Sequence, residues 1–345
     1  MEEIKGIVIR RNRDSNMELL RILAMVLVLV YHANFLSFGS PSQAEAIATP
    51  FTIFARDILN ACSAICVNLF VFISGWYGIK PKGKRFVEFL FQIGFIIAVT
   101  LILFSIFTNH KFDRHDFQAI FLMTDQMWFV KAYIILYLFS PALNAFVEKA
   151  TYKQLLLTII AFYIFQTIYG WGFVVVKWIN DGYSPVCFFG LYLLAKYIRK
   201  YKNTLTSLPA IYDLLVFAGL VIINALIAFV TIYKGFNAYM WLNSYASPLV
   251  ILETIYLALF FSKLSFRSIF INWVASSCFA VYLVHCSRNV LGAYCNTIVS
   301  IHNNYEPFIF VLYTAIFVLS VFIISIMLDK IRIVVWKYIS KLNNI

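Results

Sequence analysis

Long apolar segments that do not alternate constrain this chain more than any other feature. Residues 17–37 read MELLRILAMVLVLVYHANFLS, and several later segments are similar. About twenty apolar residues in a helix cross the roughly 30 Å hydrocarbon layer of a bilayer, whereas barrel strands alternate. The chain is 62% hydrophobic and only 13% charged, against about 25% charged in soluble domains. We therefore predict an all-α, polytopic integral membrane protein.

The apolar segments predict ten spans in one membrane domain, residues 17–328. Residues 1–16 precede it, and residues 329–345 form a basic amphipathic tail that we expect to lie on the membrane surface. The predicted spans are 17–37, 57–79, 86–108, 128–147, 153–171, 183–200, 210–232, 242–261, 269–291 and 307–328.

The basic residues are distributed unevenly between the two sides of these spans. Of the 28 Lys and Arg residues, twenty lie at the chain ends and in the loops after spans two, four, six and eight. The opposite loops hold five, and Arg21, Lys131 and Arg288 fall within spans. Positive loops stay in the cytoplasm, so we predict that both termini of this multi-pass protein are cytoplasmic. The net charge of +12 then reflects topology, and we assign no nucleic-acid partner.

Metal-binding patterns are weak in this sequence. The six cysteines form no CxxC pair and no Cys/His spacing typical of zinc, so we predict no metal. The polar loop NHKFDRHDFQ, residues 109–118, contains His110, Asp113, His115 and Asp116. These side chains are either metal ligands or, as we favour, an ordinary solvated loop.

Six ionisable side chains lie where lipid-spanning helices should be apolar. A charged residue at mid-span costs about 2.5–3.5 kcal/mol on insertion scales, so each needs a structural or functional reason. They are Arg21, His32, Lys131, Glu253, His285 and Arg288.

Arg21 and His32 are eleven residues apart in the first span. At 100° per residue, the two share one helix face, about 16 Å apart along the axis. The alternatives are that Arg21 snorkels to headgroups and that His32 bonds a neighbouring carbonyl at the interface. Together they are typical of two polar sites at different depths on one interior-facing side of the helix.

Three other segments accompany this pair. CVNLFVFISGWYGIK contains Ser74 and Gly75, a small pair that permits close backbone approach. WFVKAYIILYLFSP places Lys131 one turn inside span four, which we expect Pro141 to kink or end. AVYLVHCSRNV places His285 at a depth similar to that of His32.

These features together resemble acyltransferase family three, the membrane O-acyltransferases that modify bacterial surface glycans. The Arg21/His32 spacing, the Ser-Gly-aromatic motif within FVFISGWY, the WFVKAYIILYLFSP segment and YLVH look like family features in the family's order. The resemblance covers nearly the whole chain and implies a multi-pass protein of the bacterial cell membrane. It implies transfer of an acyl group, most often acetyl, from cytoplasmic acyl-CoA to a hydroxyl of a glycan or its lipid-linked precursor, without a permanently bound cofactor.

The resemblance also implies roles for the two first-span residues. His32 would act as general base on the acceptor hydroxyl, with a covalent acyl-histidine as the alternative. Arg21 would bind the phosphates of the donor through bidentate hydrogen bonds. Ser74 and Gly75 would shape the donor channel or simply permit close packing.

The remaining four residues are weaker candidates for substrate binding. Lys131 would stabilise an oxyanion or bind an acidic sugar, unless it snorkels. Glu253 needs a partner, for which we expect Lys or Arg from another helix, and an alternative role is to orient His32. His285 would line the cavity, with Arg288 one turn outward.

A transporter or flippase is the main competing hypothesis, because intramembrane His, Glu, Lys and Arg also mark ion paths. The sequence lacks the two related halves that many transporters show. A non-catalytic scaffold would not need Arg21 and His32 on one face.

Overall fold

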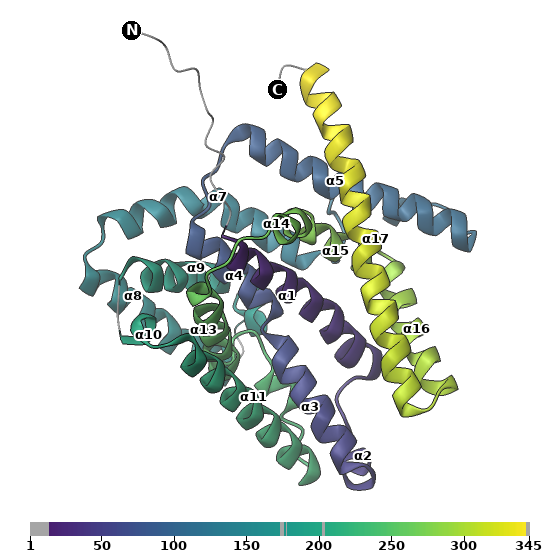
Figure 1. The fold of residues 1–345 in the computed structure, drawn as a ribbon, viewed down its shortest axis with the longest axis horizontal. Coiled ribbons are helices and arrows are strands. Elements are labelled where there is room, and N and C mark those ends of the chain that lie inside the picture. Colours follow the sequence, from purple (N-terminus) through teal and green to yellow (C-terminus); the bar gives the residue numbers. More distant parts are fainter. Residues whose placement is uncertain (1–13, 173–175, 177, 202–203, 343–345) are drawn as a thin grey trace.

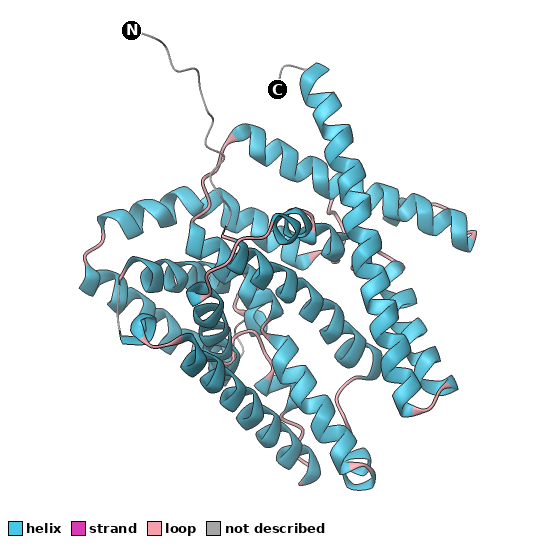
Figure 2. Cartoon of the chain, in the orientation of Figure 1, coloured by secondary structure: helices cyan, strands magenta, loops and turns pink. Residues whose placement is uncertain are grey.

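The computed structural model of the protein describes residues 14–172, 176, 178–201 and 204–342 (Figure 1). Most of the predicted N-terminal segment 1–16 lies outside this part. The described residues are almost entirely helical and contain no strand, which confirms the all-α prediction (Figure 2).

Among the described residues, seven helices are long and apolar enough to cross a membrane. Each overlaps a predicted span, and most boundaries agree within a few residues. They are α1 (Ser15–Tyr31) continued by η1 (His32–Leu36), α3 (Pro50–Ala64) with α4 (Cys66–Tyr77), α5 (Gly83–Thr108), α7 (Trp128–Lys149), α8 (Tyr152–Phe165) with η2 (Gln166–Gly172), α11 (Ala210–Tyr233) and α17 (Pro307–Leu342).

The other three predicted spans look different in the structure. α9 (Pro185–Lys200) and α13 (Pro248–Lys263) have 16 residues each, shorter than a typical span. The predicted span 269–291 is broken into α14 (Ile269–Ala275) and α15 (Cys278–His285). α16 (Val290–Asn304) then leaves at a bend of 86°, and counting this bent pair as one span raises the total to eight. Ten spans and cytoplasmic termini remain predictions.

Shorter helices occupy the connections: α2 (Gln43–Ala48), α6 (Arg114–Ile120), η3 (Asn180–Gly182), α10 (Thr204–Ser207) and α12 (Tyr239–Leu242). At the C-terminal end, α17 runs unbroken through 36 residues, about 54 Å at 1.5 Å per residue. The predicted tail 329–345 therefore continues the last helix as far as Leu342 instead of starting a new element.

α1 is the central helix of the bundle (Figure 1). It packs against α3, α4, α13, α14 and α15, and its apolar residues Leu20, Ala24 and Leu29 are fully buried. Its first residues are tied to neighbours, since the Asn16 amide donates to the Phe261 carbonyl at 2.9 Å. The residues on α1 are thus held in fixed positions relative to the surrounding helices.

α4 and α9 approach each other closely at Gly75. A Cβ added to Gly75 would lie 2.6 Å from the Tyr192 carbonyl oxygen and 2.8 Å from the Tyr192 Cα. These are backbone atoms, which cannot rotate away. Only glycine permits this contact, which fixes α9 against α4.

α7 continues through Pro141 to Lys149, so the helix does not end at the proline, one of the two outcomes expected from the sequence. Proline has no N–H to donate to the carbonyl four residues earlier, which belongs to Tyr137. The Ser140 hydroxyl donates to this Tyr137 carbonyl at 2.7 Å and replaces the missing bond. Neighbouring hydroxyls allow membrane helices to accommodate proline in this way.

The outer helices present apolar side chains outward. Phe107 on α5, Leu215 on α11 and Ile324 on α17 are all exposed, although each is large and apolar. Exposed apolar surface on this scale is unusual for a soluble monomer but fits contact with lipid. It supports a multi-pass membrane protein.

Candidate active site

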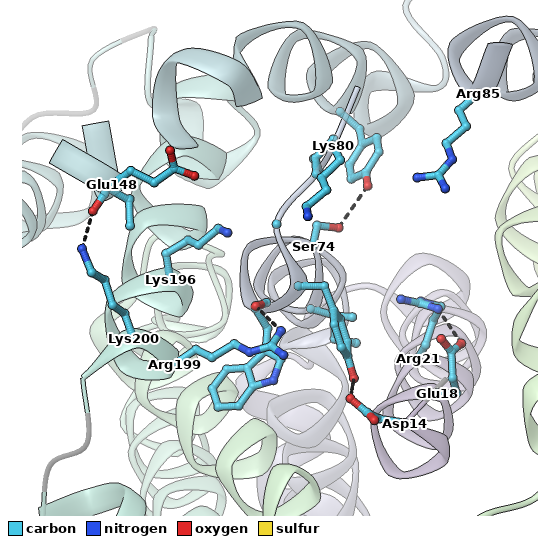
Figure 3. Close-up of a pocket in the computed structure, with 17 residues that line it drawn as sticks. Asp14, Glu18, Arg21, Ser74, Lys80, Arg85, Glu148, Lys196, Arg199 and Lys200 are labelled. Atoms are coloured by element: carbon cyan, nitrogen blue, oxygen red, sulfur yellow. Dashed lines mark hydrogen bonds and ion pairs between the residues drawn. The ribbon is translucent and has the colours of Figure 1, made fainter. Parts of the chain in front are cut away.

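A basic cavity of about 1080 Å³ lies beside the first turns of α1 (Figure 3). α1, α4, the loop after α4, α5, α7 and α9 contribute to its walls. Six cationic side chains line it together with three acidic ones. The cations are Arg21, Lys80, Arg85, Lys196, Arg199 and Lys200, and the acids are Asp14, Glu18 and Glu148.

Several of these side chains are held in place by neighbours. Arg21 donates from Nη1 to Glu18 Oε2 at 2.5 Å, one turn along the same helix. Arg199 donates to the Trp76 carbonyl at 2.6 Å, and its guanidinium lies 4.8 Å from the centre of the Tyr77 ring. Guanidinium groups fixed in this way are pre-organised for planar anions such as phosphate.

Ser74 lines this cavity, whereas Gly75 faces α9. The Ser74 hydroxyl donates to the Phe70 carbonyl at 2.9 Å, and its oxygen lies 3.0 Å from the Tyr133 hydroxyl. Within the described part of the chain, the hydroxyl of Ser74 has a carbonyl and a tyrosine hydroxyl as partners and no histidine, so this geometry provides no base to activate it as a nucleophile.

At the other end of α1, His32 meets His285. His32 Nδ1 lies 2.9 Å from His285 Nε2, and the ring centres are 5.0 Å apart. His285 is fully buried and its Nδ1 lies 2.6 Å from the Val281 carbonyl oxygen. The two histidines are therefore direct partners and not merely residues of similar depth.

The partners of this pair determine where the protons lie. A carbonyl oxygen only accepts, so His285 Nδ1 carries a hydrogen and its Nε2 has a lone pair. That lone pair accepts from His32 Nδ1–H. With both rings neutral, His32 Nε2 is left with a free lone pair. This is the arrangement of an oriented general base.

Irregular backbone brings the two rings together. His32 begins the π-helical turn η1, and His285 is the last residue of α15 before the break. The break ends at Asn289, whose φ is +67°. π-bulges and broken membrane helices are frequent at functional sites.

The basic cavity and the histidine pair are separate. His32 does not line the cavity, whereas Tyr133 does. A row of aromatic rings connects Tyr133 with the histidine pair. The ring centres of Tyr133 and Phe129 are 5.8 Å apart, those of Phe129 and Tyr282 are 5.4 Å apart, and those of Tyr282 and His285 are 6.2 Å apart. We call Tyr133, Phe129 and Tyr282 the aromatic partition.

Arg288 pairs with the polar loop, residues 109–118. It donates to Asp113 at 2.6 Å and to Asp116 at 3.1 Å. Asp116 is fully buried and also lies 2.9 Å from His110 Nε2. The hydrogen bond from Arg288, aided by the Asp116 backbone N–H, holds the pKa of Asp113 well below its usual range.

Residues 109–118 are thus tied to the broken span by the ion pairs of Arg288 with Asp113 and Asp116, and they are not simply a solvated loop. We call this connection the latch. His115 belongs to the loop, but the cluster formed by Arg288, Asp113, Asp116 and His110 does not include it. Asp113 and Asp116 also form the capping box of α6, which fixes their backbone.

Lys131 and Glu253 belong neither to the lining of the basic cavity nor to the histidine pair. Lys131 donates to the Thr124 carbonyl at 2.6 Å, in the segment before α7. Glu253 is fully buried on α13 and accepts from Asn224 of α11 at 3.2 Å. The expected Lys or Arg partner is thus an asparagine, and the position beside His32 is taken by His285.

Two parts of this arrangement were not predicted from the sequence. Lys196, Arg199 and Lys200 were used only as topology signals, although their spacing puts at least two of them on one side of α9. Cys286 had no signal of its own, yet its Sγ lies 3.4 Å from His285 Nε2. The cluster of cations in the cavity and the approach of Cys286 to His32 both follow from tertiary contacts.

Comparison with known proteins agrees with this arrangement. A family described as "acyltransferase domain" matches residues 14–330, nearly the whole chain. No curated protein and no solved structure matches the chain. The chain therefore belongs to acyltransferase family three, and its membrane-embedded bundle is an acyltransferase domain.

Proposed function

We propose that the protein moves an acyl group, most often acetyl, from acyl-CoA to a hydroxyl of a surface glycan or its lipid-linked precursor. The observation that carries this proposal is the layout of α1, which has a basic cavity at one end and an oriented histidine at the other. Membership of the acyltransferase family supports the reaction class.

The basic cavity suits the charged part of acyl-CoA. The donor carries a pyrophosphate and a further phosphate, and six cations line the cavity. Arg21 and Arg199 offer planar guanidinium donors, which match phosphate oxygens. The positive loop at Lys80 and Lys82 supports a cytoplasmic position for this end, where acyl-CoA is made.

His32 supplies the base. Its Nε2 takes the proton of the acceptor hydroxyl as that oxygen attacks the thioester carbonyl. A tetrahedral intermediate forms, the carbon–sulfur bond breaks, and the proton on His32 passes to the departing CoA sulfur. His285 accepts from Nδ1–H throughout and stabilises the imidazolium that forms between these two steps. An acyl-histidine intermediate is the alternative course.

The donor arm has to bridge the two sites. About 16 Å of helix separates Arg21 from His32, and the aromatic partition stands between them. The thioester reaches His32 when the rings of Phe129 and Tyr282 turn aside or the arm passes between them. In the absence of donor, the partition keeps cavity water from the histidine pair, which limits hydrolysis.

Transfer of label tests the proposal. Inverted membrane vesicles that contain the protein receive radiolabelled acetyl-CoA outside, and label is followed into glycan and lipid-linked sugar. The proposal predicts labelled product that depends on the protein and forms from acetyl-CoA on the side of the basic cavity. Glycan movement across the membrane without any labelled product would favour a transporter or flippase instead.

A further inference from the structure

Three metal-binding atoms converge at the histidine pair. His32 Nδ1, His285 Nε2 and Cys286 Sγ all lie within 4.8 Å of one another. The separations are 2.9 Å between the two nitrogens, 3.4 Å from Sγ to His285 Nε2 and 3.9 Å from Sγ to His32 Nδ1. Among the described residues, no other group of three such side chains lies as close.

The triangle that these atoms form fits a tetrahedral zinc ion. Zinc binds nitrogen at about 2.0 Å and sulfur at about 2.3 Å, which places two nitrogens about 3.3 Å apart and a nitrogen and a sulfur about 3.5 Å apart. The observed separations of 2.9, 3.4 and 3.9 Å depart from these values by roughly half an ångström or less. Small ring rotations supply this difference.

The surroundings of His285 resemble those of a zinc ligand. Its Nδ1 donates to the Val281 carbonyl at 2.6 Å, which leaves Nε2 free to coordinate. Ligating histidines almost always have such a partner for the other ring nitrogen, because it fixes the tautomer and the ring. The break after α15 places Cys286 beside this nitrogen, and the turn η1 presents His32 opposite.

We propose that His32, His285 and Cys286 form a site for zinc or a similar borderline-soft divalent cation, and that its occupation switches the transferase off. On binding, the Cys286 thiol releases its proton to solvent and the sulfur coordinates as thiolate. The hydrogen on His32 Nδ1 moves to Nε2, since Nδ1 now holds the metal. Nε2 then has no lone pair with which to accept a proton from the acceptor hydroxyl.

Metal binding stands on the three donor atoms alone, whereas its inhibitory effect rests on the proposed function. Two measurements therefore test them separately. The first is titration of the purified protein with Co²⁺, followed by the near-ultraviolet absorption of cobalt–thiolate bonds. The second is the Zn²⁺ concentration that halves acetyl transfer, expressed relative to each variant's own zinc-free rate.

The variants are Cys286→Ala and, as a matched control, Cys278→Ala. Cys278 is a buried cysteine at the start of α15, the helix that ends just before Cys286, and its Sγ donates to the Val274 carbonyl instead. We expect the cobalt–thiolate band in wild type and in Cys278→Ala and its loss in Cys286→Ala. The inhibitory Zn²⁺ concentration should rise at least about tenfold in Cys286→Ala only.

An unchanged cobalt band in Cys286→Ala would overturn the site. Activation by Zn²⁺, or equal inhibition of both variants, would overturn the switch. If no variant transfers acetyl at all, the proposed function fails, and the cobalt titration still decides whether the three donors bind metal.

Discussion

His285 accepts a hydrogen bond from His32 at 2.9 Å, although 253 residues separate the two in the chain. The contact joins α1 to the last residue of the short helix α15. It gives His32 one defined tautomer and leaves Nε2 as the basic atom. The base of the proposed reaction is thus built by tertiary structure and not by the first helix alone.

Replacement of His285 tests its role as a positioning residue. His285→Phe removes the acceptor for His32 Nδ1–H, and we expect kcat to fall about 10–100-fold with little change in KM for acetyl-CoA. His285→Gln offers a side-chain carbonyl oxygen and should recover part of kcat. Steady-state kinetics on both variants decide this, and equal losses in Phe and Gln would contradict a role through the hydrogen bond.

Arg21 is the donor-binding residue of the account. Arg21→Lys keeps the charge but loses the planar fork, and a charge-assisted hydrogen bond contributes about 1.5–3 kcal/mol. We expect the Kd for acyl-CoA to rise roughly 10–100-fold. The control is Arg114→Lys on α6, outside the cavity. Equilibrium binding of labelled CoA measures both, and an unchanged Kd for Arg21→Lys would remove Arg21 from the donor site.

Gly75 tests how α4 and α9 hold the cavity together. A Cβ there would lie 2.6 Å from backbone of Tyr192, so Gly75→Ala must push the helices apart. Overpacking of this kind costs about 1–3 kcal/mol. Thermal unfolding of detergent-purified protein should show a lower melting temperature. Gly94→Ala on α5, where a Cβ meets nothing within 4 Å, is the matched control and should be neutral.

The latch between Arg288 and Asp113 predicts a pH dependence of stability. The pKa of Asp113 is held below its usual range by Arg288, so the folded state binds fewer protons than the unfolded one in mild acid. This stabilisation is present above the unfolded pKa of about 3.9 and is lost as pH falls below it.

Melting temperature measured between about pH 6 and pH 3 checks this. The melting temperature of wild type should fall toward pH 3. That of Arg288→Gln should fall less, because without Arg288 the pKa of Asp113 in the folded state lies closer to its unfolded value. A profile of the same steepness in both proteins would mean that Arg288 does not lower the pKa of Asp113.

Hydropathy predicted the long helices, α1 and its continuation η1 with Arg21 and His32 among them, but it did not predict where the shorter ones begin or break. α5, α11 and α17 are long and apolar, and their positions match the prediction. α13 was predicted as a longer span, 242–261, because hydropathy alone does not show that the helix starts only at Pro248. The break at Ser276 and Ser277 and the second break that ends at Asn289 were missed for the same reason, because apolar residues on both sides gave one continuous apolar segment.

In the candidate site, too, local features were predictable from the sequence and tertiary contacts were not. The shared face of Arg21 and His32 followed from helical periodicity, which is a local property. The pairing of His32 with His285 and the tie between Arg288 and Asp113 depend on which helices meet, and one sequence does not specify this. Buried Glu253 illustrates the limit, because a charged partner was expected and the structure provides Asn224.

The central claim is that one end of α1 binds the donor while His32 performs the proton transfer at the other. The most direct measurement compares wild type with His32→Ala in two assays on the same preparation, equilibrium binding of acetyl-CoA and transfer of labelled acetyl to glycan. We expect an unchanged Kd for acetyl-CoA and a transfer rate at least about 10²-fold lower. Transfer by His32→Ala at the wild-type rate would contradict the account.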